Sequence, residues 1–210
     1  MRMDYKTVKQ QSESEIVINK SRFITSVRRT ETEQEALDFI QEIKQAHPSA
    51  NHNCSAYLIG EHDHIQKAND DGEPSGTAGF PMLEVLKKQG LKDTTVVVTR
   101  YFGGIKLGGG GLIRAYGRST SEGVAAAGTV KRVLHSTMSL TVDYTALGKV
   151  ENEVRQSEWP LAHIEYGEQV TLFILVPISD GDTFLTWVAD LTNGQGEITE
   201  GEQKFLEFSV

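Results

Sequence analysis

Glycines and basic side chains are concentrated in one short stretch of the sequence, RYFGGIKLGGGGLIRAYGRS, at residues 100–119. Glycine loses more conformational entropy on folding than any other residue, so a dense glycine tract needs a structural or a functional reason. This tract lies between a predicted buried strand and a predicted helix, which brings unpaired N–H groups and the positive helix end to one point. Glycines there let a phosphate approach the backbone closely. The stretch therefore predicts an anion-binding loop.

Basic and aromatic side chains accompany these glycines. Arg114 and Arg118 are four residues apart, so they share one face of the predicted helix. Lys106 lies within the loop, and Arg100 just before it, which completes a plausible clamp for phosphates. The predicted anion- or RNA-binding set comprises Arg100, Tyr101, Phe102, Gly103, Gly104, Lys106, Gly108, Gly109, Gly110, Gly111, Arg114 and Arg118.

A purely structural interpretation of the same residues stays open. Gly103 and Gly104 can form a tight turn, glycines 108–111 can allow close helix–strand packing, and Arg118 can pair with Glu122. The tract also departs from the templates of nucleotide enzymes. Glycines at 109 and 110 replace the Lys and Ser/Thr of a P-loop, and Ile113 breaks the GxGxxG pattern. A conventional nucleotide-binding enzyme is not supported.

Acidic residues gather in a second stretch, NDDGEPSGTAG, at residues 69–79. Asp70, Asp71 and Glu73 can bind a cation or act as acids, although carboxylates in a Gly/Pro turn are more often solvated or helix-capping. We expect Ser75 or Thr77 to cap the helix that follows.

Histidines and the single cysteine lie close together in sequence, at His47, His52, Cys54, His62 and His64. Their spacing matches no metal-binding pattern, so no metal site is expected. His52 and Cys54 are two residues apart on a predicted strand and have no third group to orient them, which favours a buried, inert thiol over a nucleophile. We therefore predict no catalytic residue, no metal and no cofactor.

The net charge of −8 conceals an uneven distribution. Residues 87–135 contain 9 Lys and Arg but 2 Asp and Glu, a net charge of +7, whereas residues 1–86 carry −5 and residues 136–210 carry −10. The glycine tract lies inside this basic block. Because charge asymmetry bears on the choice of partner, the block indicates an anionic one.

Composition also bears on the compartment. One cysteine excludes an intramolecular disulfide. The first residues, MRMDYKTVKQQSESE, lack the apolar run of a signal peptide, and no stretch reaches the roughly 18 apolar residues of a membrane span. We expect a cytoplasmic protein without membrane contact.

Periodicity predicts the elements that carry these residues. We expect two short strands within 15–30 that meet near 19–20, a helix over 30–47, strands over 54–60 and 65–68, a helix over 81–89, a strand over 94–102, and a helix from the glycine tract to about 127. The first helix can start with a capping box formed by Thr30 and Glu33 or by Thr32 and Glu35. The run TTVVVTRYF is rich in β-branched residues, as is typical of a strand buried on both faces.

The rest of the chain follows a different order. We expect a strand over 137–144, a helix over 145–156, a hairpin over 162–178, a helix over 182–193 and a strand over 202–210. The order βαββαβ is the ferredoxin-like plan. The charge changes near residue 136, so we predict two domains, residues 1–135 and residues 136–210. The fold class is α+β.

Four segments, KSRFITSV, HNCSAYLIG, NDDGEPSGTAGFPMLEVL and TRYFGGIKLGGGGLIRAYG, together resemble the bacterial YigZ branch of the IMPACT family. The resemblance implies an N-terminal domain like domain IV of elongation factor G, with the β-α-β fold of a small-subunit ribosomal protein and of GHMP kinases. It implies a C-terminal domain like domain V of the same factor. Besides the stretch at 100–111, the family motifs fall on Arg22, Phe23, His52, Asp71, Gly72, Glu73, Pro74, Ser75 and Gly76.

Two functions follow from these observations. The first is a non-enzymatic module of translation that binds RNA, the ribosome or a protein of the translation apparatus, with Tyr101 or Phe102 available to stack on bases. The alternative is an enzyme or sensor for a small phosphorylated ligand, with Asp71 or Glu73 as a metal or acid–base partner. A protein-interaction adaptor is a third possibility.

Overall fold

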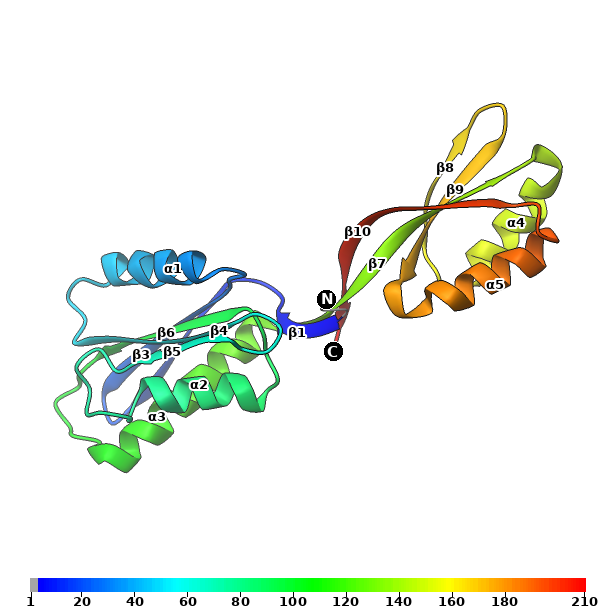
Figure 1. Cartoon of the computed structure of the whole chain (residues 1–210). Coiled ribbons are helices and arrows are strands. Elements are labelled where there is room, and N and C mark those ends of the chain that lie inside the picture. Colours follow the sequence, from blue (N-terminus) through cyan, green and yellow to red (C-terminus); the bar gives the residue numbers. More distant parts are fainter. Residues whose placement is uncertain (1–3) are drawn as a thin grey trace. The chain divides into compact units, whose positions relative to one another are not determined.

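The computed structural model describes residues 4–210 (Figure 1). The chain forms two compact units: an N-terminal domain of residues 5–131 with 209–210, and a C-terminal domain of Asp4 with residues 132–208. The division falls inside β7 (Thr129–Val142), four residues before the boundary placed from the charge pattern. Within residues 4–210, no helix combines the length and the apolar character needed to cross a membrane.

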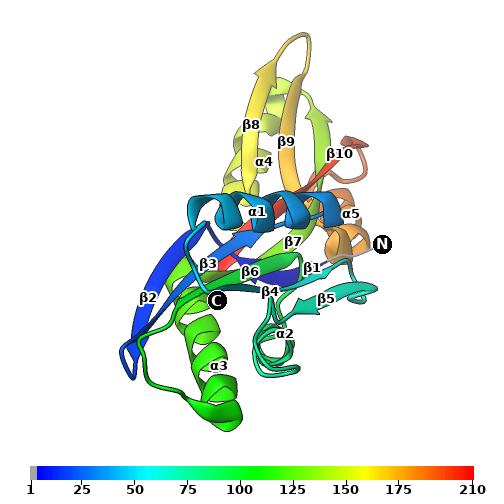
Figure 2. The same cartoon turned by 90° about the vertical axis from the view of Figure 1, so that its left-hand side faces the viewer.

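The N-terminal domain is built on one antiparallel sheet with the order β2-β3-β6-β4-β5. Its strands are β2 (Ser12–Ile18), β3 (Ser21–Arg29), β4 (His52–Ile59), β5 (Ile65–Asn69) and β6 (Thr94–Tyr101). Central β6 is buried at every position before Tyr101, which confirms the prediction of a strand covered on both faces. Helix α1 (Glu33–Ala46) covers one face, and α2 (Gly79–Lys88) and α3 (Gly108–Ala127) cover the other (Figures 1 and 2).

Helix α1 begins as the sequence predicts. Thr32 is the N-cap residue, and its hydroxyl accepts a hydrogen bond from the Glu35 N–H at 3.2 Å. Of the two capping pairs left open, the structure therefore selects Thr32 with Glu35. Ala36, Phe39 and Ile43 form the buried face of the helix.

The start of α2 differs from the prediction. Ala78 is the N-cap residue, Ser75 is exposed, and the Thr77 hydroxyl donates to the Pro74 carbonyl at 2.6 Å, so the prediction that Ser75 or Thr77 caps this helix is wrong. Asp70 takes that role from the far end of the loop. Its carboxylate accepts the N–H groups of Gly76 at 2.8 Å, Ala78 at 3.0 Å and Gly79 at 2.8 Å.

This long-range cap is possible because Gly79 lies directly on the end of β5. A Cβ at Gly79 would be 2.5 Å from the backbone nitrogen of Asn69. Only glycine brings the first turn of α2 this close to the residue that precedes Asp70.

Helices α2 and α3 run parallel and pack at glycines. The Cβ position of Gly109 lies 4.0 Å from Thr77, and that of Gly117 lies 4.0 Å from Val85, so both helices start at the same end of the domain. Farther along α3, a Cβ at Gly123 would be 2.3 Å from the Thr25 side chain, so this glycine sets how closely α3 packs on β3.

The C-terminal domain follows the predicted βαββαβ order. It contains part of β7, then α4 (Tyr144–Gln156), β8 (Leu161–Tyr166), β9 (Val170–Pro177), the short 3₁₀ helix η1 (Ile178–Asp180), α5 (Gly181–Thr192) and β10 (Glu197–Ser209). In the sheet, β7 lies between β9 and β10, and β8 pairs with β9. The strand β1 (Asp4–Val8), which the sequence analysis did not predict, also pairs with β7.

Candidate functional site

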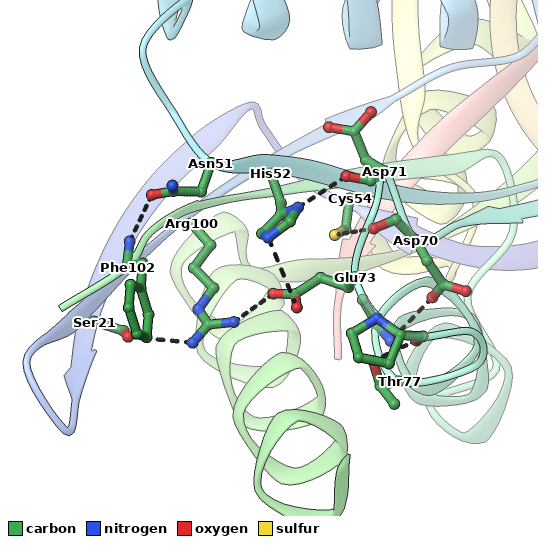
Figure 3. Close-up of polar contacts among 12 residues, drawn as sticks. Ser21, Asn51, His52, Cys54, Asp70, Asp71, Glu73, Thr77, Arg100 and Phe102 are labelled. Atoms are coloured by element: carbon green, nitrogen blue, oxygen red, sulfur yellow. Dashed lines mark hydrogen bonds and ion pairs between the residues drawn. The ribbon is translucent and has the colours of Figure 1, made fainter. Parts of the chain in front are cut away.

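The segments that carry the four family-like motifs meet at one end of the N-terminal sheet (Figure 3). Strand pairing explains part of this convergence, because Arg100 on β6 is the register partner of both Phe23 on β3 and His52 on β4. The loop between β5 and α2 supplies Glu73, and the loop after β6 supplies Phe102.

A buried ion pair joins the two loops. The Arg100 guanidinium is 2.6 Å from a Glu73 carboxylate oxygen. Both side chains are buried, with exposed fractions of 5% for Arg100 and 4% for Glu73. The Tyr116 hydroxyl donates to the same carboxylate oxygen at 2.8 Å, and Arg100 also reaches the Ser21 hydroxyl at 3.3 Å. A buried charge is stable only when it is paired, so Arg100 and Glu73 depend on each other.

His52 and Asp71 fix the outer side of this cluster. His52 Nδ1 lies 2.9 Å from the Asp71 carbonyl, which can only accept, so Nδ1 carries the hydrogen and Nε2 faces Glu73 at 3.8 Å. Burial opposes ionisation of Asp71, but hydrogen bonds from the Asn53 N–H and from Lys44 hold its pKa below the ordinary value. Asp71 therefore anchors the loop to β4 and α1.

Cys54 lies beneath this loop. Its sulfur is 3.0 Å from the Asp70 carbonyl oxygen and 3.3 Å from the Tyr116 hydroxyl. Burial raises the pKa of the thiol to about 12. The thiol is protonated at neutral pH, which supports an inert structural cysteine.

Three glycines of the tract are required by the backbone itself. A Cβ at Gly103 would lie 2.0 Å from the carbonyl carbon of Lys20, in the turn between β2 and β3. Gly104 and Gly108 have φ angles of +85° and +68°, which favour glycine. Gly111 has little spare room, because its Cβ would be 3.1 Å from Leu107.

Gly109 and Gly110 have no such requirement. Both have ordinary helical φ angles, and a Cβ would meet its nearest neighbours at 4.0 Å and 3.6 Å, the latter being the flexible end of Arg114. Both are exposed in the first turn of α3, and within residues 4–210 no side chain caps that turn. The N–H groups of this first turn are therefore uncovered, and packing does not require glycine at either position.

The four cations expected to form a clamp occupy different environments. Arg114 extends back over Gly110, and Lys106 is exposed in the adjoining loop, so both lie at the bare N-terminus of α3. Arg118 lies 3.9 Å from Glu122, as in the structural interpretation. Arg100 is buried below in its pair with Glu73.

The two aromatic candidates also differ. The Tyr101 hydroxyl is 3.0 Å from His47 Nδ1, and Arg22 lies over its ring, so Tyr101 is held on the protein. Phe102 is 46% exposed, and the Arg100 guanidinium lies 5.6 Å from the centroid of its ring. Phe102 borders a pocket of about 390 Å3 lined by Glu73, Pro74, Arg100, Phe102, Lys106, Leu107, Gly108, Gly109 and Leu112.

Comparison with known proteins identifies the relatives of this chain. Residues 19–124 match the Impact N-terminal domain, and residues 140–195 match a domain of unknown function, DUF1949. The chain is 60% identical to the IMPACT family member YvyE of Bacillus subtilis, over 98% of this chain and 95% of that protein. The chain belongs to the IMPACT family.

Other relatives agree with this assignment. IMPACT family member YigZ of Escherichia coli is 34% identical over 89% of this chain and 92% of that protein. A crystal structure described as that of a hypothetical protein matches with a TM-score of 0.62 and 30% identity, covering 96% of this chain and 99% of that one.

The other residues on which the family motifs fall either contact side chains of the N-terminal domain or lie in the loop between β5 and α2. Phe23 is fully buried against Tyr116, and Arg22 forms a two-point contact with Glu15. Gly72 and Gly76 have positive φ angles, and Pro74 and Ser75 are exposed. Among residues 4–210, no group of three or more His, Cys, Asp or Glu side chains is arranged to hold a metal ion.

Sequence reasoning missed four residues that complete the site. Tyr116 bonds Glu73, Ser21 bonds Arg100, Lys44 bonds Asp71, and the Asn51 side chain accepts the Phe102 N–H at 2.8 Å. Each contact joins residues more than 25 positions apart, so no local sequence pattern predicts these contacts. If the burial of Glu73 could be predicted from the sequence, it would indicate partners of this kind, because a buried carboxylate must be paired or hydrogen-bonded.

Proposed function

We propose that the N-terminal domain is a non-enzymatic module that binds single-stranded RNA in the context of translation. The bare first turn of α3 and the loop before it form the contact surface. The observation that carries the proposal is the presence of Gly109 and Gly110 where alanine would fit and stabilise the helix. Glycine at both positions keeps backbone N–H groups open to a phosphate.

Cations extend from this turn along the helices. Arg118 is ten residues beyond Gly108, about 15 Å along α3 at 1.5 Å per residue. Lys87 and Lys88 lie in the last turn of parallel α2. Two of these cations lie near carboxylates, Arg118 at 3.9 Å from Glu122 and Lys87 at 3.9 Å from Glu84. The distance from Gly108 to Arg118 exceeds the size of one phosphate group, which favours a polymer of phosphates.

Phe102 adds a feature that duplex binding does not need. Phe102 is partly exposed, it borders the same pocket as Lys106, and the Arg100 guanidinium lies 5.6 Å from its ring centroid. Aromatic faces beside cations bind unstacked bases, and this combination is typical of proteins that bind single strands.

The acidic and nucleophilic groups nearby are already engaged. Asp70 caps α2, Asp71 pairs with Lys44, Glu73 pairs with Arg100, and the thiol of Cys54 is protonated. This arrangement favours binding over catalysis. Membership of the IMPACT family, with the likeness to elongation factor G domains IV and V that this membership leads us to expect, supports translation as the context.

The test is RNA binding by the full chain across a salt series. We expect the Lys106→Ala/Arg114→Ala variant to lose about tenfold or more in affinity and to lower the slope of log affinity against log salt by about 1.4, at about 0.7 per lost phosphate contact. Arg155→Ala/Lys204→Ala removes the same charge from the C-terminal domain and should bind normally. Equal losses in both variants, or no binding at low salt, would exclude this surface as the RNA site.

A second candidate is a sensor or enzyme for a small phosphorylated ligand. The pocket of about 390 Å3 favours it, because small-molecule sites span about 300–1,000 Å3. Affinity that does not rise with RNA length, and is matched by a mononucleotide, would support this alternative over the first.

A further inference from the structure

A separate pocket in the C-terminal domain is lined by acidic and aromatic side chains. It has a volume of about 270 Å3 and lies between β7, the loop before β8, the end of β9 and β10. The residues that decide its chemistry are Glu158, Trp159, Pro160, Pro177, Asp180 and Phe208.

One buried donor belongs to a residue that lines this pocket and lacks a partner. Trp159 is 6% exposed, and its indole N–H makes no hydrogen bond within the part of the chain that the structure describes. A buried indole N–H normally has a partner, and leaving it unpaired is costly. The N–H is closed to solvent, so an acceptor carried by a ligand would satisfy it only if binding opens the pocket at Trp159.

The polar groups at the rim of the pocket are acceptors with negative charge. Glu158 is exposed, Asp180 is half-buried, and residues 136–210 carry a net charge of −10. Pro160 and Pro177 have no N–H, so the backbone adds no donor at these positions. The ligand must therefore bring positive charge and donors of its own, which disfavours RNA at this pocket.

The apolar part of the pocket suits a long cationic side chain. The Phe208 ring is 44% exposed and stacks on His135, with ring centroids 5.9 Å apart. Lysine and arginine lay their aliphatic stems on such surfaces and keep the charged end at carboxylates, and an aromatic face adds cation–π attraction.

We propose that this pocket binds a lysine- or arginine-containing segment of a partner protein. The cation pairs with Glu158 and Asp180, the stem lies on Phe208, and binding opens the pocket at Trp159, so that a main-chain carbonyl of the segment accepts the indole N–H. A free metal ion or a simple amine satisfies the carboxylates but offers no acceptor to the indole. The proposal is independent of RNA binding by the N-terminal domain.

The experiment uses the full chain and a blocked synthetic peptide in which arginine and lysine alternate with alanine. The protein has two tryptophans, so NMR shows two indole N–H signals, and a Trp187→Phe variant identifies that of Trp159. We expect the peptide to move the Trp159 signal downfield and saturably, while the Trp187 signal stays in place.

Charge variants decide between a site and general attraction. Glu158→Gln/Asp180→Asn should weaken peptide binding tenfold or more, whereas Glu168→Gln/Glu202→Gln, with the same change in charge on exposed residues of the same domain, should not. A second peptide with citrulline and acetyl-lysine in place of the cations should fail to bind. Equal weakening in both variants, equal binding of the neutral peptide, or an unmoved Trp159 signal would overturn the proposal.

Discussion

At the scale of single residues, the glycine tract combines two kinds of glycine. Gly103 is needed because the Lys20 carbonyl occupies the space of a side chain, whereas a methyl group at Gly109 or Gly110 would make only ordinary contacts, at 4.0 Å and 3.6 Å. Sequence alone could not separate them, since the difference depends on contacts with the distant turn between β2 and β3.

The first prediction concerns Gly109 and Gly110. Gly109→Ala and Gly110→Ala should each raise the free energy of unfolding by up to about 1 kcal/mol, because alanine has the higher helix propensity and loses less entropy on folding. Both should weaken RNA binding, since a methyl group keeps phosphate away from the N–H groups. Urea unfolding and RNA titration measure the two effects. Higher stability with unchanged affinity would leave the glycines without a binding role.

The second prediction concerns Cys54. The pKa of its thiol is raised from 9.0 to about 12 in the folded state, so the folded protein holds this proton more tightly than the unfolded chain. The resulting stability is fully present below pH 9 and is lost as the pH rises from 9 towards 12, by up to about 1.4 kcal/mol per pH unit.

Alkaline urea unfolding of the wild type and of Cys54→Ala checks this effect. The wild type should lose stability more steeply above pH 9 than the variant, because only the wild type has the thiol. Parallel curves would show that the thiol does not titrate differently on unfolding.

At the scale of elements, sequence patterns predicted most of the strands and helices, but they missed β1, the first eight residues of β7 and the cap of α2. The β-branched run of β6 and the apolar spacing of α1 are local, so they are visible in the sequence. Asp70 reaches the start of α2 only because Gly79 lies against Asn69, and that contact is tertiary.

The third prediction tests this cap. Asp70→Ala should lower the free energy of unfolding by about 2 kcal/mol, the upper range for loss of a helix cap, and Asp70→Asn should lower it less because one oxygen acceptor remains. Urea unfolding at neutral pH gives both values. An Asp70→Ala variant as stable as the wild type would show that the loop caps α2 in another way.

The same cap predicts a pH dependence. Burial opposes ionisation of Asp70, yet the N–H groups of Gly76, Gly79 and Ala78 hold its pKa below the ordinary value of 3.8. This stability is present above about pH 3.8 and is lost as the pH falls through the lower folded pKa. In acid, Asp70→Asn should therefore lose less stability than the wild type.

The fourth prediction contrasts two positions on α3. Gly123→Ala should destabilise the N-terminal domain by about 1–3 kcal/mol, because the new methyl group would overlap buried Thr25, whose hydroxyl is bonded to Ser119. The identical substitution at Gly110 should stabilise it. A stabilising Gly123→Ala would mean that β3 and α3 can move apart without cost.

At the scale of the whole molecule, the two domains have separate hydrophobic cores. The core around Phe23, Val96 and Met82 shares no residue with the core around Leu140, Leu172 and Val188. The βαββαβ order of the second domain could be predicted because each of its elements is local and the order is simple. The position of β1 beside β7 could not, because strand partners far apart in sequence leave no periodic mark.

The fifth prediction is that different probes report different unfolding transitions. Both tryptophans, Trp159 and Trp187, lie in the C-terminal domain, and Cys54 lies in the core of the N-terminal domain. Gly123→Ala should therefore shift the urea midpoint for Cys54 labelling and leave the midpoint of tryptophan fluorescence unchanged. A shared shift would show that the domains unfold as one unit.

Because the single cysteine, Cys54, is buried in a core, a cysteine introduced at the surface can be labelled selectively. Ser75 is exposed next to Pro74 at the pocket border, so Ser75→Cys would introduce the one thiol that reacts under native conditions. A fluorophore attached there would test the proposed RNA binding in an otherwise natural chain. A second introduced cysteine at exposed Glu202 would carry an acceptor dye, and energy transfer would then follow the C-terminal domain as RNA is added.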